Sequence, residues 1–257
     1  MTLYIQLQGG IGNQFFQYAA GLVLKESCEV RLIKGVPTHS RRDYRDILYR
    51  RLSSADAPPG IPLLELDPFN VWKPEDYVRP YDRILQGYFQ YLPAIQSVLP
   101  QLREDILKTL RPHRDAMRIK YGLHDLSSVG FLHVRRGDYL TAPPNFHWIM
   151  GTEYYRNAMI KYEQKLKWIL LSDDVAWCRE QEFFTEFHTI EIVDEPDELY
   201  GLALMSLCHG GAIIGNSTYS WWGAMLGAEP AEATVVYPSR WLAYEKPSLF
   251  PSRWIRL

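Results

Sequence analysis

The sequence predicts an α/β fold of two lobes, each built on parallel strands joined by helices. Two observations lead to this prediction: the chain opens on a strand–helix–strand unit, and its second half alternates short apolar runs with helical stretches. A polar, basic stretch at residues 111–124 separates the two patterns. It places the boundary between a first domain, 1–120, and a second domain, 121–257, in a chain long enough to bury both cores.

The first lobe begins with a period of two over residues 3–7, which indicates a strand. Helical spacing follows over residues 14–25, and a β-branched run at residues 30–33 predicts the next strand. Prolines interrupt residues 36–100, where only residues 84–91 suggest a buried strand. This part of the chain therefore allows little detailed assignment.

The second lobe is more regular. Strands are expected at residues 129–134, 166–171, 189–193, 212–214 and 234–237. Helices are expected near residues 101–110, before this lobe, and then near 153–165, 175–187, 196–208 and 218–227. In an open parallel sheet of this kind ligands bind beyond the carboxyl ends of the strands, so the functional residues are expected where each strand ends.

Composition excludes several classes of protein. The 28 Lys and Arg residues are balanced by 30 Asp and Glu, which argues against a general nucleic-acid binder. The three cysteines form no C-x-x-C pair, so neither a disulfide framework nor a cysteine zinc site is expected, and a reducing compartment fits. The chain shows no basic leader and no apolar run long enough to span a membrane. A cytoplasmic protein is expected.

The first strand leads into a glycine-rich loop, Gly9 to Gln14. Gly10 and Gly12 fit the start of a dinucleotide fingerprint, but Phe15 occupies the position of the third glycine and the loop lacks the G-K-[ST] of a P-loop. Glycines let a backbone approach a ligand, and a helix N-terminus favours an anion. A tight turn with Asn13 as the N-cap is an equally good interpretation.

The strand at 129–134 leads into a cluster of charged residues. His133 and Arg135 project to the same side of an extended chain, and arginine can hold a phosphate through two parallel hydrogen bonds. The alternative is an ordinary turn in which Arg136 and Asp138 form an exposed ion pair. Two arginines and an acid at the edge of a sheet favour a functional site.

Two further strand ends carry polar residues. Ser172, Asp173 and Asp174 follow one strand, where carboxylates can accept from the edge of a base or cap the next helix. Asn216, Ser217 and Thr218 follow another strand, where hydroxyl and backbone N–H groups can hold a phosphate oxygen. The alternative for the second segment is an N-cap followed by two core tryptophans.

Other patterns carry less information. The sequence contains neither H-E-x-x-H nor Asp-x-Asp, which weakens any metal-dependent nucleotide-sugar scheme. The basic cluster at residues 41–51 suits an anionic acceptor or a lipid surface, but a solvated helix face explains it better.

Taken together, the four strand ends resemble the α-1,2-fucosyltransferases of glycosyltransferase family 11. The matching segments are Gly9-Gly-Ile-Gly-Asn-Gln-Phe-Phe-Gln-Tyr-Ala19, His133-Val-Arg-Arg-Gly-Asp-Tyr139, Ser172-Asp-Asp174 and Asn216-Ser-Thr-Tyr-Ser-Trp-Trp-Gly-Ala224. The resemblance runs from about residue 3 to residue 242. Ile11 replaces the family's usual Leu, and the middle section is shorter than usual.

This resemblance implies a B-type glycosyltransferase fold of two Rossmann-like lobes, with the acceptor side in the first and the donor site in the second. It implies inverting transfer of fucose from GDP-β-L-fucose to the 2-hydroxyl of a galactose-containing glycan, with no cofactor and no metal. A cytoplasmic enzyme that acts on lipid-linked glycans, with possible peripheral contact with the inner membrane, is expected from the resemblance.

The resemblance also implies roles for individual residues. Arg135 is expected on the β-phosphate, His133 near the guanine and Asp138 as the candidate general base. The remaining donor-binding candidates are Gly10, Gly12, Asn13, Arg136, Ser172, Asp173, Asp174, Asn216, Ser217 and Thr218.

Three alternatives remain open at this stage. One is a transferase on the same fold with another nucleotide sugar. Another is a Rossmann oxidoreductase, which the Gly10-x-Gly12 loop favours and Phe15 opposes. The last is a sugar-binding module without catalytic activity.

Overall fold

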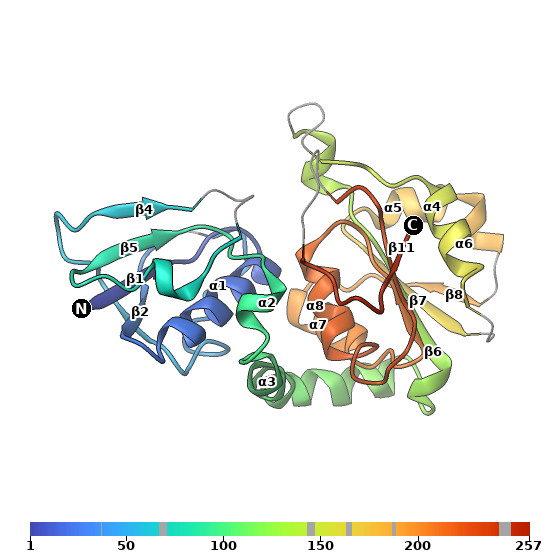
Figure 1. The fold of residues 1–257 in the computed structure, drawn as a ribbon. Helices are drawn as coiled ribbons and strands as arrows, with labels where there is room; N and C mark the ends of the chain where they lie inside the picture. Colours follow the sequence, from blue (N-terminus) through green and yellow to red (C-terminus); the bar gives the residue numbers. More distant parts are fainter. Residues whose placement is uncertain (37, 67–70, 143–146, 163–165, 187–188, 242–247) are drawn as a thin grey trace. The chain divides into compact units, whose positions relative to one another are not determined.

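The computed structural model of the chain describes residues 1–36, 38–66, 71–142, 147–162, 166–186, 189–241 and 248–257. The chain divides into two compact units: unit 1 holds Met1–Thr109 and Pro247–Pro251, and unit 2 holds Leu110–Lys246 and Ser252–Leu257. Each unit has its own parallel sheet (Figure 1). The two-lobed α/β fold predicted from the sequence is therefore confirmed.

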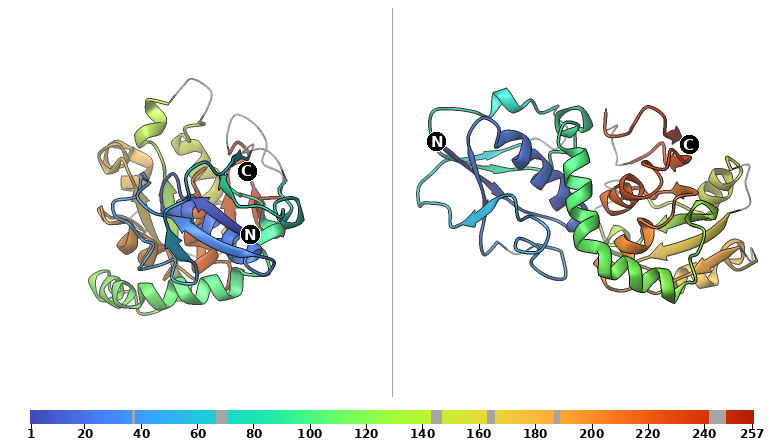
Figure 2. Two further views of the ribbon diagram at one scale, coloured as in Figure 1. Left: turned by 90° about the vertical axis from the view of Figure 1, so that its left-hand side faces the viewer. Right: turned by 90° about the horizontal axis from the view of Figure 1, so that it is seen from below.

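Unit 1 is built on a five-stranded sheet in the order β3-β2-β1-β5-β4. Its strands are β1 Thr2–Gln6, β2 Glu29–Ile33, β3 Ser53–Ala55, β4 Leu63–Glu65 and β5 Arg83–Gln86. The helix α1, Ile11–Leu24, packs beside this sheet, and Figure 2 shows it next to β1 and β2. The sequence predicts β1, α1 and β2, whereas the three-residue strands β3 and β4 and the short helix α2, Leu92–Ile95, were missed because prolines surround them.

The basic cluster at residues 41–51 is not a helix face, and this part of the prediction is wrong. The segment forms turns in which Arg45 is almost fully buried and paired with Asp43. Arg51 forms an ion pair with Asp105. Acidic partners within unit 1 therefore bind part of the positive charge that the sequence suggested for an anionic acceptor or a lipid surface.

The boundary between the units lies inside a long helix. The sequence predicts a helix at 101–110 followed by a polar boundary, but α3 is one continuous helix, Leu99–Lys120, that includes Pro112 (Figure 2). The two units separate between Thr109 and Leu110, which is earlier than the predicted boundary at 120/121. Arg114, in the polar stretch, donates to the backbone and side-chain oxygens of the buried Ser206, which ties this end of α3 to the rest of unit 2.

Unit 2 is built on a six-stranded sheet in the order β11-β10-β9-β6-β7-β8. Its strands are β6 Val129–Val134, β7 Lys167–Ser172, β8 Ile190–Ile192, β9 Gly211–Ile213, β10 Val235–Tyr237 and β11 Ile255–Arg256. All residues of β6 are buried, as expected for a central strand of a parallel sheet. Five of these strands follow the sequence prediction to within two residues at each end.

Helices cover both faces of this sheet. Figure 1 shows α7 and α8 on one face and α4, α5 and α6 on the other. Their bounds are α4 Thr152–Met159, α5 Val175–Glu180, α6 Glu182–Glu186, α7 Glu198–Met205 and α8 Thr218–Leu226. The helix predicted at 175–187 is thus two shorter helices, and part of the one predicted at 153–165 lies outside the described residues.

All three cysteines, Cys28, Cys178 and Cys208, are free thiols, so the structure contains no disulfide. Within the described ranges, no helix is both long enough and apolar enough to cross a bilayer.

Candidate functional site

The candidate site lies where the central strands of unit 2 end. β7, β6 and β9 are neighbours in the sheet, and Val134, the last residue of β6, pairs with Ser172 of β7. Because parallel strands end at the same edge, the segments that follow them meet there. The structure thus brings Arg135, Asp173 and Asn216 to three adjacent strand ends.

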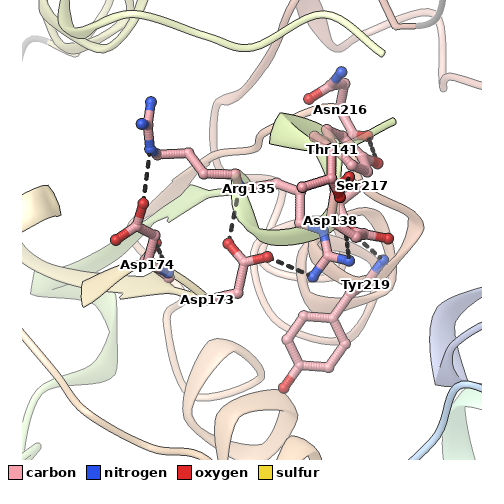
Figure 3. Close-up of polar contacts among 11 residues, drawn as sticks. Arg135, Asp138, Thr141, Asp173, Asp174, Asn216, Ser217 and Tyr219 are labelled. Atoms are coloured by element: carbon pink, nitrogen blue, oxygen red, sulfur yellow. Dashed lines mark hydrogen bonds and ion pairs between the residues drawn. The ribbon is translucent and has the colours of Figure 1, made fainter. Parts of the chain in front are cut away.

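Arg135 is held between two carboxylates (Figure 3). Its Nη2 donates to Oδ1 of Asp138 at 2.5 Å, and its Nη1 lies 2.8 Å from Oδ2 of Asp173. The guanidinium also lies over the ring of Tyr139, with its central carbon 5.2 Å from the ring centroid. About a third of the Arg135 side chain remains exposed, so the fork can still reach a ligand.

Arg136 points to a different partner. Its backbone N–H donates to Oδ1 of Asp173 at 2.9 Å, and its Nε donates to Oδ2 of Asp174 at 3.0 Å. The guanidinium covers the ring of Trp177 at 3.9 Å from the centroid. The simple alternative from sequence, a turn ion pair between Arg136 and Asp138, is therefore wrong, because Asp138 forms its ion pair with Arg135.

Both acidic residues after β7 have structural partners. Asp174 caps α5, since its Oδ1 accepts from the backbone N–H of Trp177 at 3.1 Å. Asp173 fixes the loop after β6 through the Arg135 and Arg136 contacts, and Gly137 leaves room for it: a Cβ there would lie 2.3 Å from Oδ2 of Asp173. The Ser172 hydroxyl accepts from the backbone N–H of Asp174. The capping interpretation is correct for Asp174.

The segment after β9 starts α8. Ser217 is the N-cap, and its hydroxyl accepts from the backbone N–H of Tyr219 at 3.3 Å, with Thr218 as the first helical residue. The two tryptophans that follow are buried, as the alternative interpretation required. The first N–H groups of this nine-residue helix give the sheet edge a positive potential next to Arg135.

Asn216 is buried and acts as a clamp. Its Nδ2 donates to the carbonyls of Trp148 at 2.7 Å and Trp241 at 3.1 Å. It thereby joins the segment before α4 and the segment after β10 to the start of α8. The sequence prediction of Asn216 as a donor-binding residue did not anticipate this contact.

His133 is a neutral imidazole inside the unit. It is 4% exposed, and burial, helped by the charge of Arg135, lowers its pKa to about 3. Its backbone carbonyl accepts from the hydroxyl of Tyr155 at 3.1 Å. The predicted contact between His133 and guanine remains a prediction.

Sequence reasoning missed two aromatic residues at this edge. The hydroxyl of Tyr139 donates to the carbonyl of Asn216 at 2.8 Å, and burial raises its pKa to about 12. The ring of His147 stacks on that of Tyr139, with centroids 3.7 Å apart and planes 2° from parallel. Tyr139 could have been identified from the sequence because it belongs to the motif after β6, whereas His147 lies in no recognisable motif.

The glycine loop belongs to unit 1. Gly9 adopts φ of +71° and Gly10 is the N-cap of α1, so the interpretation with Asn13 as the cap is wrong. Asn13 lies in the first turn and its Oδ1 accepts from Nε2 of Gln90. Gly12 is buried within α1. The role of Gly10, Gly12 and Asn13 toward a donor remains a prediction.

Among the residues that the structure describes, no three or more His, Cys, Asp or Glu side chains gather as a metal would need.

Comparisons with known proteins identify the family. The model of the family described as Glycosyl transferase family 11 matches residues 79–255. Over 99% of its length the chain is 30% identical to the whole of the O-antigen biosynthesis glycosyltransferase WbnK of Escherichia coli. It is 25% identical to an alpha-1,2-colitosyltransferase of Escherichia coli, over 98% of this chain and 97% of the relative.

A solved structure supports the fold. The glycosyl transferase family 9 protein from Veillonella parvula superposes with a TM-score of 0.53 at 12% identity, covering 100% of this chain and 86% of that chain. This likeness concerns the fold alone, and it agrees with two parallel α/β units of the B-type glycosyltransferase class. The match to the family model and the full-length relative show more: the chain belongs to glycosyltransferase family 11 and is a glycosyltransferase.

Proposed function

We propose that the protein transfers L-fucose from GDP-β-L-fucose to the 2-hydroxyl of a galactoside, with inversion at C1 and without a required metal ion. One observation carries the proposal: Arg135 and the N-terminus of α8 lie at adjacent strand ends, where both can hold a diphosphate. The relative named as an alpha-1,2-colitosyltransferase supports the 1,2 linkage, and the O-antigen relative supports a glycan acceptor.

In the proposed reaction the acceptor oxygen bonds to C1 of fucose while the bond from C1 to the β-phosphate oxygen breaks. The electron pair of that bond stays on GDP, so negative charge grows on the β-phosphate. The acceptor hydroxyl loses its proton to a base, and an α-fucoside and GDP are the products. Fixed donors around the phosphate stabilise the developing charge.

We expect Arg135 to become available to a phosphate by giving up one of its ion-pair partners. Two arginines, Arg135 and Arg136, face three carboxylates, which leaves an excess negative charge that opposes a diphosphate. Asp138 is 67% exposed, so its ion pair with Arg135 contributes little. Asp173 is more buried and also accepts from the backbone of Arg136. We therefore expect the phosphate to displace Asp138 and to leave Asp173 in place.

The same exchange allows Asp138 to act as the general base. Once the phosphate has taken Arg135, the Asp138 carboxylate has no cationic partner and can accept the proton of the acceptor hydroxyl. Arg135 then acts on the leaving group and Asp138 on the nucleophile. The two catalytic residues proposed from sequence are thus coupled through one ion pair that the donor breaks.

The remaining donor contacts follow the strand ends. We place the phosphates on Ser217 and Thr218 at the start of α8, and the guanine beside β7, near His133 and Arg136. The oxygens of Asp173 and Asp174 already accept hydrogen bonds, but each has a second lone pair for an N–H of the base. In this arrangement Ser172 and Asn216 support the contacts rather than make them.

A second candidate donor is the GDP ester of colitose, because one relative is named as an alpha-1,2-colitosyltransferase. Colitose is the 3-deoxy analogue of L-fucose, so the two donors differ by a single hydroxyl. Turnover of both donors with the same acceptor distinguishes the two functions.

Two measurements test the proposal. GDP should raise the melting temperature more than UDP, ADP or NAD does, because a ligand that binds only the native state stabilises it by RT ln(1 + [L]/Kd). In a turnover assay, GDP-L-fucose and a β-galactoside should give GDP and an α-1,2-linked product, with EDTA present throughout. Stabilisation by UDP, ADP or NAD in place of GDP would contradict the proposed donor, and oligosaccharide binding without release of GDP would contradict the proposed transfer.

The natural acceptor and its location in the cell can also be proposed. The O-antigen relative supports a glycan acceptor. From the family resemblance we propose further that this glycan is lipid-linked and that the protein acts at the cytoplasmic side of the inner membrane. Vesicles that carry such a lipid-linked galactoside should give a lower KM than the free disaccharide. An equal KM for the two acceptors would contradict the proposed action at a membrane.

A further inference from the structure

Two tryptophan–arginine pairs flank the candidate phosphate site of unit 2. On one side Arg136 covers Trp177, and on the other the guanidinium of Arg240 lies 4.2 Å from the centroid of the Trp148 ring. The two rings differ in their surroundings. Trp177 packs against the buried core and meets Phe184, whereas Trp148 is 45% exposed. An exposed indole beside a guanidinium presents an apolar face next to hydrogen-bond donors.

The exposed pair is attached to the phosphate site. Asn216, the residue before the N-cap of α8, donates to the carbonyl of Trp148 and to that of Trp241, the neighbour of Arg240. Asn216 is 2% exposed, so little freedom remains in this clamp. The residue that precedes the proposed phosphate-binding helix therefore holds the backbone of Trp148 and the backbone next to Arg240.

The order of the strands indicates on which side of the phosphate site the base and the sugar of a donor lie. The sheet runs β7, β6, β9, β10, so Trp177 follows β7, Arg135 follows β6 and Arg240 follows β10. Neighbouring strands lie about 4.8 Å apart. The distance from one strand end to the next is therefore similar to the size of one part of a nucleotide sugar, such as a phosphate or a sugar ring. In such a donor the base and the sugar lie on opposite sides of the diphosphate. With the base beside β7, the sugar lies on the side of β10.

From this geometry, and resting on the proposed function, we propose that Trp148 and Arg240 form the subsite for the transferred sugar. The indole of Trp148 contacts the apolar side of the pyranose, including the methyl group at C6, and the guanidinium of Arg240 donates to ring hydroxyls. A 6-deoxy sugar fits this surface because its methyl group loses no hydrogen bond to water there. A hydroxymethyl group in the same place would lose one.

The test compares two donors that differ only at C6, GDP-L-fucose and GDP-L-galactose, in the full-length protein with a β-galactoside acceptor. The wild type should prefer GDP-L-fucose in kcat/KM by about tenfold or more, as expected for a small group in an apolar subsite. Trp148→Ala should lose most of this preference by lowering kcat/KM for GDP-L-fucose, and Trp148→Phe should keep part of it. The Kd of GDP, which has no sugar, should stay within about twofold, since only the sugar contact is removed.

A matched control separates this effect from the loss of any exposed apolar side chain. Ile160, just after α4 in the same unit, is 75% exposed, and Ile160→Ala should change neither the donor preference nor the Kd of GDP. Arg240→Ala should lower kcat/KM for both donors alike, because it contacts hydroxyls that both sugars share.

The outcomes are distinguishable. If the wild type turns over GDP-L-fucose and Trp148→Ala retains the full preference for it, the subsite is wrong while the proposed function stands. A Trp148→Ala variant that weakens GDP as strongly as GDP-L-fucose would place the indole at the nucleotide and also overturn the inference. If the wild type uses neither GDP-L-fucose nor GDP-L-galactose, the proposed function itself fails, and the subsite fails with it.

Discussion

The hydroxyl of Tyr139 donates a 2.8 Å hydrogen bond to the carbonyl of Asn216. This contact joins the loop that carries Arg135 to the residue that precedes α8. The Tyr139 ring also lies beneath the guanidinium of Arg135 and against the ring of His147. The spacing between Arg135 and the start of α8 in the proposed phosphate site therefore depends on one partly buried tyrosine.

Tyr139→Phe tests this dependence. The variant keeps the ring and leaves the Asn216 carbonyl without that donor, which should cost about 1–3 kcal/mol of stability. The melting temperature should fall by several degrees, and the Kd of GDP should rise because Arg135 and α8 lose their common anchor. Thermal scans with and without GDP measure both effects. Tyr139→Leu should be worse in both, and a Phe variant equal to the wild type in both would show that the contact is dispensable.

Arg135→Ala should lower kcat by about 10² to 10³, because the variant removes a fixed donor from the leaving phosphate. Arg135→Lys should also be severely impaired, since a point charge does not reproduce the two parallel hydrogen bonds of the fork. Steady-state turnover of GDP-L-fucose measures both. Arg253, which forms an exposed ion pair with Glu229, provides the control, and Arg253→Ala should keep wild-type turnover. Wild-type rates from the lysine variant would contradict the role of Arg135.

Asp138→Asn should separate binding from chemistry. The substitution removes the carboxylate that competes with the diphosphate for Arg135, so GDP should bind as tightly as in the wild type or more tightly. It also removes the proposed base, so kcat should fall by about 10²-fold or more. Calorimetric titration with GDP and a turnover assay on the same preparation decide the matter. Weaker GDP binding together with normal kcat would reverse both assignments.

The strand ends of unit 2 could be predicted because each signal is local. The apolar run 129–134 coincides with β6, and the residues after it are polar for a few positions only. Parallel alternation then places Arg135, Asp173 and Asn216 at one edge without any knowledge of distances. The family resemblance rests on these same segments, and the family match confirms it.

The sequence could not predict which side chains form ion pairs and hydrogen bonds with one another. The simple alternative pairs Arg136 with Asp138, but in the structure Arg135 forms the ion pair with Asp138, and Arg136 pairs with Asp174, which follows β7. Long-range hydrogen bonds such as that of Tyr139 to Asn216, 77 residues apart, leave no trace in periodicity. In α3, Arg114 contacts Ser206 within unit 2, in a polar stretch that the sequence predicted as the boundary between the two lobes.

His133 should make stability depend on pH. Its pKa in the native protein, about 3, lies below the ordinary value of 6.5, so the unfolded chain binds more protons between these two values. The free energy of unfolding should therefore decrease as the pH falls below about 6.5, by at most about 1.4 kcal/mol per pH unit from this group. His133→Gln should show a smaller drop in melting temperature between pH 7.5 and pH 5 than the wild type. His124→Gln, at an exposed position, is the control and should behave like the wild type.

Gly215→Ala should disturb the distance between the ends of β9 and β6. A Cβ at this position would lie 2.9 Å from the backbone carbonyl oxygen of His133 and 3.6 Å from the backbone nitrogen of Arg135. Backbone atoms of a central strand move little, so the strain should cost about 1–3 kcal/mol and shift Asn216 away from the arginine loop. The melting temperature should fall, and the stabilisation that GDP provides should shrink. Gly151→Ala is the matched control, because a Cβ at Gly151 meets nothing within 4 Å, and it should keep the full GDP effect. A Gly215→Ala protein with the same GDP effect as the control would show that donor binding tolerates a shift of this strand end.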